Sequence, residues 1–241
     1  MRVFASGLAV VGSLFSLPVM AQTTITDARL TTVVGSDALI NNQVAQVDSV
    51  ATVGEQVRTT QARAEMLLNT GSLSRLGIHS TYTVGAECIE LVAGKLLVEG
   101  PSQVCFGNAV IAVQGTTYVL EVFQQDQARL SVLEGTVLVS DSQQPTTPPV
   151  PLAAGEFIDL RRDGGRGSRE DISFFGYRQL VTDELFVAFP ALPNVRKIRA
   201  AYVRLFPDER VPPSIGIPSD RAPSNEKSPQ FSSSSSSPST P

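Results

Sequence analysis

Seven glycines recur at nearly regular intervals through the first two thirds of the chain and divide it into short apolar segments. The intervals between them run from 17 to 23 residues. The glycines are Gly35, Gly54, Gly71, Gly94, Gly115, Gly135 and Gly155. The segments are rich in β-branched residues and short for helices, and glycine permits the positive φ of a tight turn. The spacing predicts an all-β body of short strands, with Gly71, Gly94, Gly115, Gly135 and Gly155 as structural turns.

One part of this body is marked as a β-hairpin. Residues 118, 120 and 122 alternate with residues 119, 121 and 123, four polar residues follow at 124–127, and a second alternating run covers 129–134. A period of two is typical of a strand with two different faces. Repeated turns at this interval suit a stack of β-coils, which would make the body solenoid-like, and they suit a β-sandwich equally. Both architectures stay open.

The composition changes after Arg162. A glycine-rich stretch at 163–167 indicates a flexible link, and Ser168 with Asp171 can cap a first helix. A second helix is expected to begin at Pro193 and end at Pro207. Its apolar stripe is Val195, Ile198, Tyr202, Leu205 and Phe206. We therefore expect a β-domain over 22–163 and a helical extension over 168–206 that packs on it.

The last 35 residues hold 8 prolines and 11 serines. Such a composition buries too little apolar surface to offset the entropy of ordering the chain. A disordered Ser/Pro-rich tail is predicted over 207–241.

The first residues have the pattern of a secretory signal. A basic start at Arg2 precedes an apolar stretch that is broken by Pro18, and small residues stand at the positions that a signal peptidase reads. We expect a signal peptide over 1–21, cleavage after Ala21, and a periplasmic or secreted mature protein with no membrane-spanning helix. A single uncleaved membrane anchor is the alternative.

The chain has two cysteines, Cys88 and Cys105. In an oxidising compartment such a pair forms a disulfide more often than not. The alternative is a pair of buried, inert thiols in neighbouring strands.

Charge and residue counts argue against several classes of function. Nineteen basic and 23 acidic residues give a net charge of -4, whereas a nucleic-acid binder needs a basic surface. One histidine and two cysteines cannot supply a four-ligand zinc site. A nucleophile elbow and a phosphate-binding glycine loop are both missing from the sequence. We expect no metal and no cofactor, and the protein is predicted not to be an enzyme.

Several charged residues are candidates for a functional site. His79 is expected to be a surface or hydrogen-bonded side chain, and Glu121, Glu134 and Glu156 are expected on outward faces of strands. Basic residues gather on the second helix as Arg196, Lys197, Arg199 and Arg204. They fit a solvated helix face, or contact with an anionic lipid headgroup or acidic glycan. Arg58, Arg63 and Arg75 could clamp an anion, but are expected to bond backbone carbonyls or Glu65.

Several short motifs, in order, resemble the FecR domain across residues 54–160. They are V-R-T at 57–59, A-R-A-E at 62–65, G-S-L-S-R-L-G at 71–77, L-V-A-G-K-L-L-V at 91–98, V-Q-G-T-T-Y at 113–118, L-E-G-T-V-L-V at 133–139 and L-A-A-G-E at 152–156. The resemblance implies an all-β extracytoplasmic domain. In the best-known members of the family, that domain senses an outer-membrane siderophore receptor and regulates a sigma factor through a cytoplasmic segment.

This chain has a signal sequence where the cytoplasmic segment would stand, so it resembles the exported, stand-alone FecR-domain proteins of cyanobacterial type. The resemblance implies a non-catalytic periplasmic or cell-envelope module for protein–protein contact or envelope sensing, with an envelope or outer-membrane protein as partner. Docking by addition of a strand to a sheet edge is one expected mode. The alternative is a carbohydrate- or peptidoglycan-binding envelope protein, which would be expected to carry an aromatic platform, and tryptophan is absent.

Overall fold

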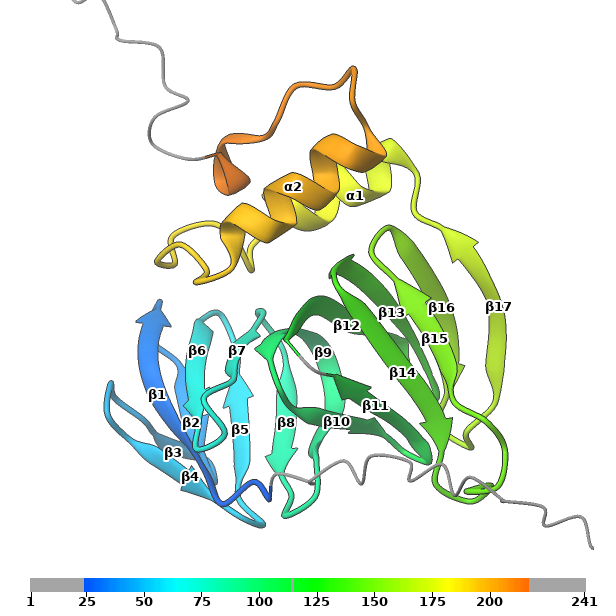
Figure 1. The fold of residues 1–241 in the computed structure, drawn as a ribbon. Coiled ribbons are helices and arrows are strands. Elements are labelled where there is room, and N and C mark those ends of the chain that lie inside the picture. Colours follow the sequence, from blue (N-terminus) through cyan, green and yellow to red (C-terminus); the bar gives the residue numbers. More distant parts are fainter. Residues whose placement is uncertain (1–23, 114, 217–241) are drawn as a thin grey trace, which may run out of the picture.

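The computed structural model describes residues 24–113 and 115–216 and confirms the strand-rich fold. Seventeen strands are followed by two α-helices and a short 3-10 helix (Figure 1). The predicted signal peptide over 1–21 and residues 217–241 of the predicted tail lie outside the described residues.

The strands form two layers, sheets A and B, which share one strand. Sheet A has the order β4 (Val50–Thr52), β1 (Asp27–Val34), β6 (Arg63–Leu68), β7 (Leu73–Leu76), β9 (Ile89–Gly100), β12 (Thr116–Gln124), β13 (Gln127–Glu134), β16 (Glu156–Arg161) and β17 (Arg166–Asp171). Sheet B has the order β3 (Gln43–Val44), β2 (Ala38–Ile40), β5 (Gln56–Thr59), β8 (Thr81–Val84), β9, β10 (Gln103–Phe106), β11 (Ala109–Val113), β14 (Thr136–Asp141) and β15 (Val150–Ala153).

Strand β9 belongs to both layers. Its first half pairs with β8 and β10 in sheet B, and its second half pairs with β7 and β12 in sheet A. Among the described residues, every pairing is antiparallel except that of β9 with β10. Stacked coils would instead pair in parallel, so the fold is a sandwich of bent antiparallel strands rather than a solenoid.

The recurrent glycines mark where the chain passes from one sheet to the other. Six of the seven lie at such corners, and Gly71 lies in the β6–β7 hairpin. All seven have a positive φ. At Gly94, in the bend of β9, an added Cβ would also come within 2.5 Å of the Cα of Ser80. Glycine is required there both for the backbone conformation and for the close approach of the neighbouring chain.

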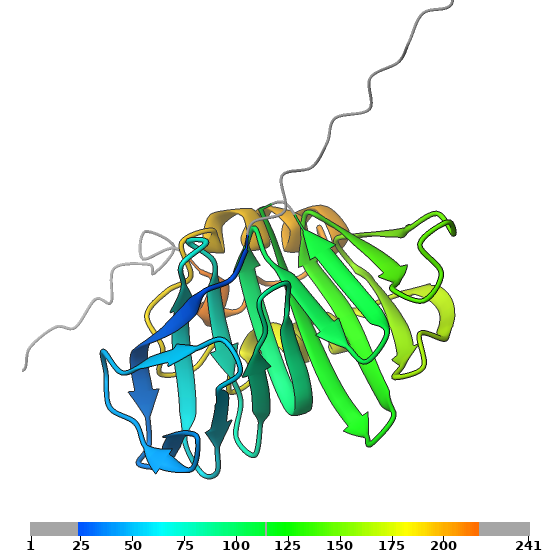
Figure 2. The ribbon, with the colours of Figure 1, turned by 90° about the horizontal axis from the view of Figure 1, so that it is seen from below.

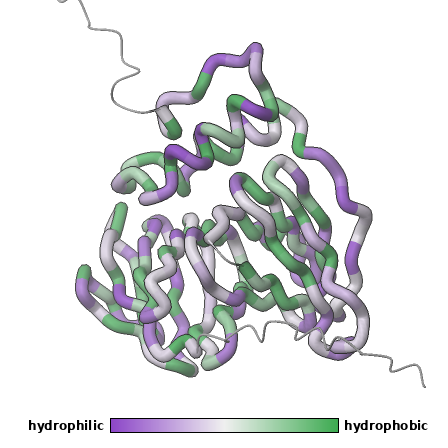
Figure 3. Tube along the Cα trace, viewed as in Figure 1, coloured by the Kyte–Doolittle hydropathy of each residue, from purple (hydrophilic) through white to green (hydrophobic). Residues whose placement is uncertain are grey.

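The part of sheet A beneath the helices is buried on both faces, which explains why its central strands are apolar at successive positions there. Leu96 and Val98 of β9 face the core between the sheets, and Leu97 faces the helices. Strand β12 repeats this pattern, with Tyr118 inside the sandwich and Val119 beneath the helices. In Figure 3, apolar stretches (green) run along the strands of the sandwich, with hydrophilic residues (purple) among them.

Helix α1 (Phe174–Thr182) begins later than the sequence predicted. The predicted cap at Ser168 and Asp171 is wrong, because residues 166–171 form the edge strand β17 against β16. The helix is capped by Ser173, whose Oγ accepts a hydrogen bond from the backbone N–H of Gly176. The predicted link at 163–167 is the turn and the start of β17. The hydrogen bonds that strand pairing offered this segment outweighed its weak helical pattern.

Helix α2 (Val195–Leu205) matches the prediction, and its buried residues are Ile198, Ala201 and Tyr202. The helices cover one end of the outer face of sheet A (Figures 1 and 2). The chain remains packed beyond Pro207, where the sequence predicted a disordered tail. Tyr202 donates to the carbonyl of Arg210, and Ile215 of the 3-10 helix (Pro213–Ile215) is fully buried. The folded part therefore includes residues 207–216. No helix in the described part of the chain is long and apolar enough to span a membrane.

Candidate functional site

The segment that joins the two helices is fixed to sheet A by a buried arginine. Arg75 of β7 lies opposite Glu65 of β6, and its Nε donates to Oε2 of Glu65 over 2.8 Å. The same guanidinium donates to the carbonyls of Leu185 and Pro190 and stacks on the ring of Phe189. The Arg75 side chain is 1% exposed. This arginine therefore connects sheet A directly to residues 185–190.

Neighbouring cations hold the same segment. Arg63 donates to the carbonyls of Glu184 and Val187. Lys95 of β9 forms an ion pair with Asp183, with 2.6 Å between Nζ and Oδ2. Arg63 and Arg75 thus bond carbonyls and Glu65, as the sequence predicted, rather than binding an anion together. Arg58 is exposed on the other sheet.

A polar cluster lies where α2 begins, beside the bent ends of three neighbouring strands of sheet A. The backbone N–H of Asn194 donates to Oε1 of Glu99 over 2.9 Å. Its side-chain amide donates to Thr117 over 2.6 Å and to Glu134 over 3.2 Å. Glu99, Thr117 and Glu134 are cross-strand neighbours in β9, β12 and β13. Asn194 therefore joins the helix to all three strands.

Burial raises the pKa of both glutamates in this cluster. For Glu99, the loss of hydration is the largest effect, and the nearby charge of Glu134 adds to it, while the Asn194 N–H, Arg75 and Lys197 oppose it. For Glu134, the loss of hydration is again largest, and Lys197 and the Asn194 amide oppose it. Both carboxylates are therefore less well stabilised as anions than glutamates in water.

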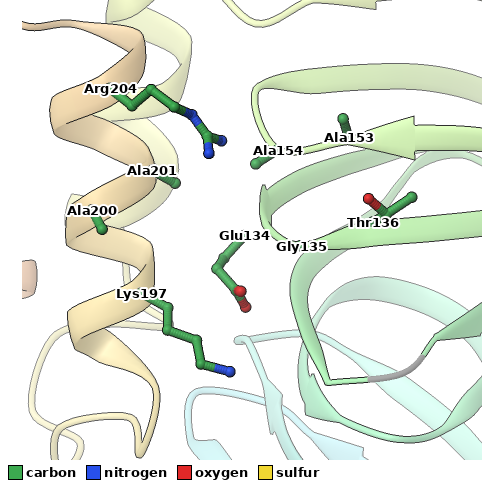
Figure 4. A pocket seen from close by; sticks show the side chains of 9 residues that line it. All are labelled: Glu134, Gly135, Thr136, Ala153, Ala154, Lys197, Ala200, Ala201 and Arg204. Carbon is green, nitrogen blue, oxygen red and sulfur yellow. The ribbon is translucent and has the colours of Figure 1, made fainter.

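Next to Glu134, a pocket of about 490 Å³ opens between α2 and the strand corners. It is lined by Glu134, Gly135, Thr136, Ala153, Ala154, Lys197, Ala200, Ala201 and Arg204. Figure 4 shows the carboxylate of Glu134 turned toward the end of Lys197, with the guanidinium of Arg204 at the other end of this space, near Ala154. The strands supply the acid and the helix supplies both cations.

The structure separates the three glutamates that the sequence singled out. Glu121 pairs with Lys95, Glu156 with Arg169, and Glu134 alone lines the pocket. His79 is an exposed turn residue with a φ of 50°, and its Nε2 lies 3.3 Å from the side chain of Gln61. It is thus the surface, hydrogen-bonded histidine that was expected.

The basic residues of α2 divide into two groups. Lys197 and Arg204 line the pocket and Arg196 does not, but all three are exposed, as expected for the solvated helix face that the sequence predicted. Sequence reasoning missed Asn194, Thr117 and Glu99. No motif marked them, because their contacts join residues that are about 60 to 95 positions apart.

The two cysteines are joined in the structure, as predicted. The disulfide links Cys88, just before β9, to Cys105 in β10, and their Cα atoms are 5.8 Å apart. It crosses the pair of parallel strands within sheet B. Within residues 24–113 and 115–216, no cluster of His, Cys, Asp or Glu side chains has the arrangement of a metal site.

Exposed apolar residues gather on the segment 43–53, which closes the N-terminal end of the sandwich. Here β3 is the edge of sheet B and β4 is the edge of sheet A. The exposed side chains are Val44, Val47, Val50 and Val53, of which Val44 is 71% exposed. We call these four residues the valine patch. At the opposite end, β15 contains Pro151 and β17 is mostly charged, two features that discourage pairing with a further strand.

No family model and no curated protein sequence matches this chain. Two crystal structures of a "putative anti-sigma factor" from Parabacteroides distasonis are similar to it. The first is 18% identical, covers 64% of this chain and 76% of that chain, and has a TM-score of 0.43. The second is 17% identical, covers 59% of this chain and 73% of that chain, and has a TM-score of 0.44. Similarity at this level assigns the chain to no family.

Proposed function

We propose that this protein is an exported, non-catalytic module of the cell envelope that contacts another envelope protein, in the manner of a stand-alone FecR-like domain. The motifs that resemble the FecR domain support this proposal, because they coincide with structural positions. The glycines of these motifs lie at strand turns and corners. Arg75, in the motif at 71–77, is the buried residue that holds the helical extension on the sheet.

The valine patch is the observation that carries the proposal. Its four exposed valines lie within eleven residues whose one ionisable side chain is Asp48. Apolar side chains gathered on one exposed segment are typical of protein contact sites, whereas singly scattered ones are not. The partner surface is accordingly apolar and uncharged at its centre.

The size of the patch favours a transient contact with a different protein. Four partly exposed valines offer a few hundred Å² at most, whereas a stable dimer buries about 800 Å² per partner. The sheet edges beneath the patch are also short, with two residues in β3 and three in β4. Contact through the valine side chains is therefore favoured over the addition of a long strand.

Site-specific crosslinking tests this proposal. A photoreactive residue at position 44 or 53 should capture one envelope protein, and the same residue at position 175 should not, although Phe175 is 78% exposed. The captured protein, once purified, should bind the Val44→Asp/Val53→Asp variant at least tenfold more weakly than the unaltered protein. Phe175→Asp, the matched control, should change binding by less than twofold.

Other results would contradict the proposal. Crosslinks between copies of this chain alone would assign the patch to self-association. Binding to isolated peptidoglycan that survives the valine substitutions would favour the glycan-binding alternative.

Export is tested separately by mass spectrometry of the mature protein. The proposal requires a chain that begins at Gln22 in the periplasmic or secreted fraction. An intact Met1 in the membrane fraction would contradict it.

A further inference from the structure

We propose that the pocket between α2 and the corners of β13–β14 and β15–β16 binds a small dipolar ligand that carries both a carboxylate and an ammonium group, such as a short peptide. This site is distinct from the valine patch, and the inference does not depend on the proposed protein contact.

The sequence of α2 places two cations on one side of an open space. Lys197 and Arg204 are seven residues apart, so they lie on the same helix face about two turns from each other. Ala200 and Ala201 lie between them and present only methyl groups to the pocket. Long side chains therefore flank a gap that small ones leave open (Figure 4).

These two cations are poorly matched by the surrounding protein. Both side chains are exposed where they line the pocket, and within the described part of the chain neither the Lys197 ammonium nor the Arg204 guanidinium makes an ion pair or hydrogen bond. Arg204 presents a planar guanidinium, which suits two parallel hydrogen bonds to one carboxylate. The helix side of the pocket is thus suited to the carboxylate of a ligand.

The opposite wall supplies a single carboxylate. The Glu134 side chain is fixed by the hydrogen bond from Asn194 to its Oε2. Its partial burial raises its pKa, and Lys197 is near enough to act on it without forming an ion pair. A ligand ammonium at Glu134 would supply the close positive charge that this carboxylate lacks.

The remaining walls match the size and the middle part of such a ligand. Ala153 and Ala154 complete an apolar lining between the charged groups, and 490 Å³ lies within the range of small-molecule sites. A simple anion would use the cations and be repelled by Glu134. A neutral sugar would leave all three charges unpaired.

Calorimetric titration of the folded protein at pH 7 tests the inference. The probes are alanyl-alanine, its N-acetyl derivative and its C-terminal amide. Alanyl-alanine should bind, and each derivative, which lacks one of the two charges, should bind at least tenfold more weakly. No detectable binding of alanyl-alanine at 10 mM, or equal binding of all three probes, would overturn the inference. Preference for the N-acetyl derivative or for inorganic phosphate would also overturn it, in favour of an anion site.

Variants of the pocket residues test which side chain binds each charge of the ligand. Arg204→Ala should weaken the binding of alanyl-alanine at least tenfold. Glu134→Gln, which keeps an acceptor for Asn194, should abolish the preference for the free amine over the N-acetyl probe. Arg196→Ala removes an exposed cation from the same helix but not from the pocket, and should change affinity by less than twofold. An equal loss in all three variants, with unchanged circular dichroism, would contradict the assignment.

Discussion

Arg75 binds Glu65 across neighbouring strands and, with the rest of its guanidinium, holds the carbonyls of Leu185 and Pro190. One side chain thus satisfies a carboxylate and two carbonyls, and it is almost entirely buried. A charge in such a place is tolerated because its partners replace water. The β-body and its helical extension are therefore joined by a contact that neither could complete alone.

Removing this arginine should be strongly destabilising. Arg75→Ala leaves Glu65 buried without its ion-pair partner, and we expect a loss of about 3–5 kcal/mol in the free energy of unfolding. Urea unfolding measures this loss, and limited proteolysis should show early cleavage within 183–192. Arg58→Ala, at an exposed arginine, should change the stability by less than about 0.5 kcal/mol. Similar losses in both variants would contradict the assigned role of Arg75.

The disulfide between Cys88 and Cys105 should stabilise the fold by restricting the unfolded chain. The two residues are separated by 17 positions, and a loop of this length corresponds to about 3 kcal/mol in the chain-entropy model. A Cys88→Ser/Cys105→Ser variant should lose about that amount in denaturant unfolding. Addition of a reductant should shift the midpoint of the unaltered protein and leave that of the variant unchanged.

Glycines with similar φ angles should differ in their tolerance to alanine. At Gly71 a Cβ meets no atom within 4 Å, so Gly71→Ala should cost only the left-handed conformation, about 1–2 kcal/mol. At Gly94 the same Cβ would overlap Ser80. Gly94→Ala should therefore lower the free energy of unfolding by more than about 4 kcal/mol, or prevent folding. Gly115 is as open as Gly71 and should behave like it. Thermal melts of the three variants give the order directly.

Acidification should favour the folded state through Glu99 and Glu134. Burial raises the pKa of both in the folded state, so the folded protein binds their protons more tightly than the unfolded chain does. Their contribution to stability therefore grows as the pH falls from 7 through the raised pKa values, and it is complete below the usual value of 4.5. A Glu99→Gln/Glu134→Gln variant should lack this gain. When the pH is lowered from 7 to 5, the thermal midpoint of the unaltered protein should rise more, or fall less, than that of the variant.

The glycine spacing predicted the strands well because it reports a local constraint. Each positive φ is required within its own segment, so Gly94 or Gly135 can be recognised from the flanking residues alone. The same spacing could not distinguish a solenoid from a sandwich, because that difference lies in which distant strands pair.

The pocket could not be found in this way. Glu134 and Lys197 are 63 residues apart, and they meet only because α2 crosses the end of sheet A. The helix start predicted within residues 166–171 was wrong for a similar reason. Serine and acidic residues typical of a helix start lie here on an edge strand, because the segment pairs with β16.

The shared strand β9 has a mechanical consequence. Strands β1 to β8 lie on one side of it and β10 to β17 on the other, apart from the contacts that the helices add. Neither side can separate from β9 without opening a ladder in both layers. The described body should therefore unfold as one cooperative unit, with a single calorimetric transition instead of one for each half.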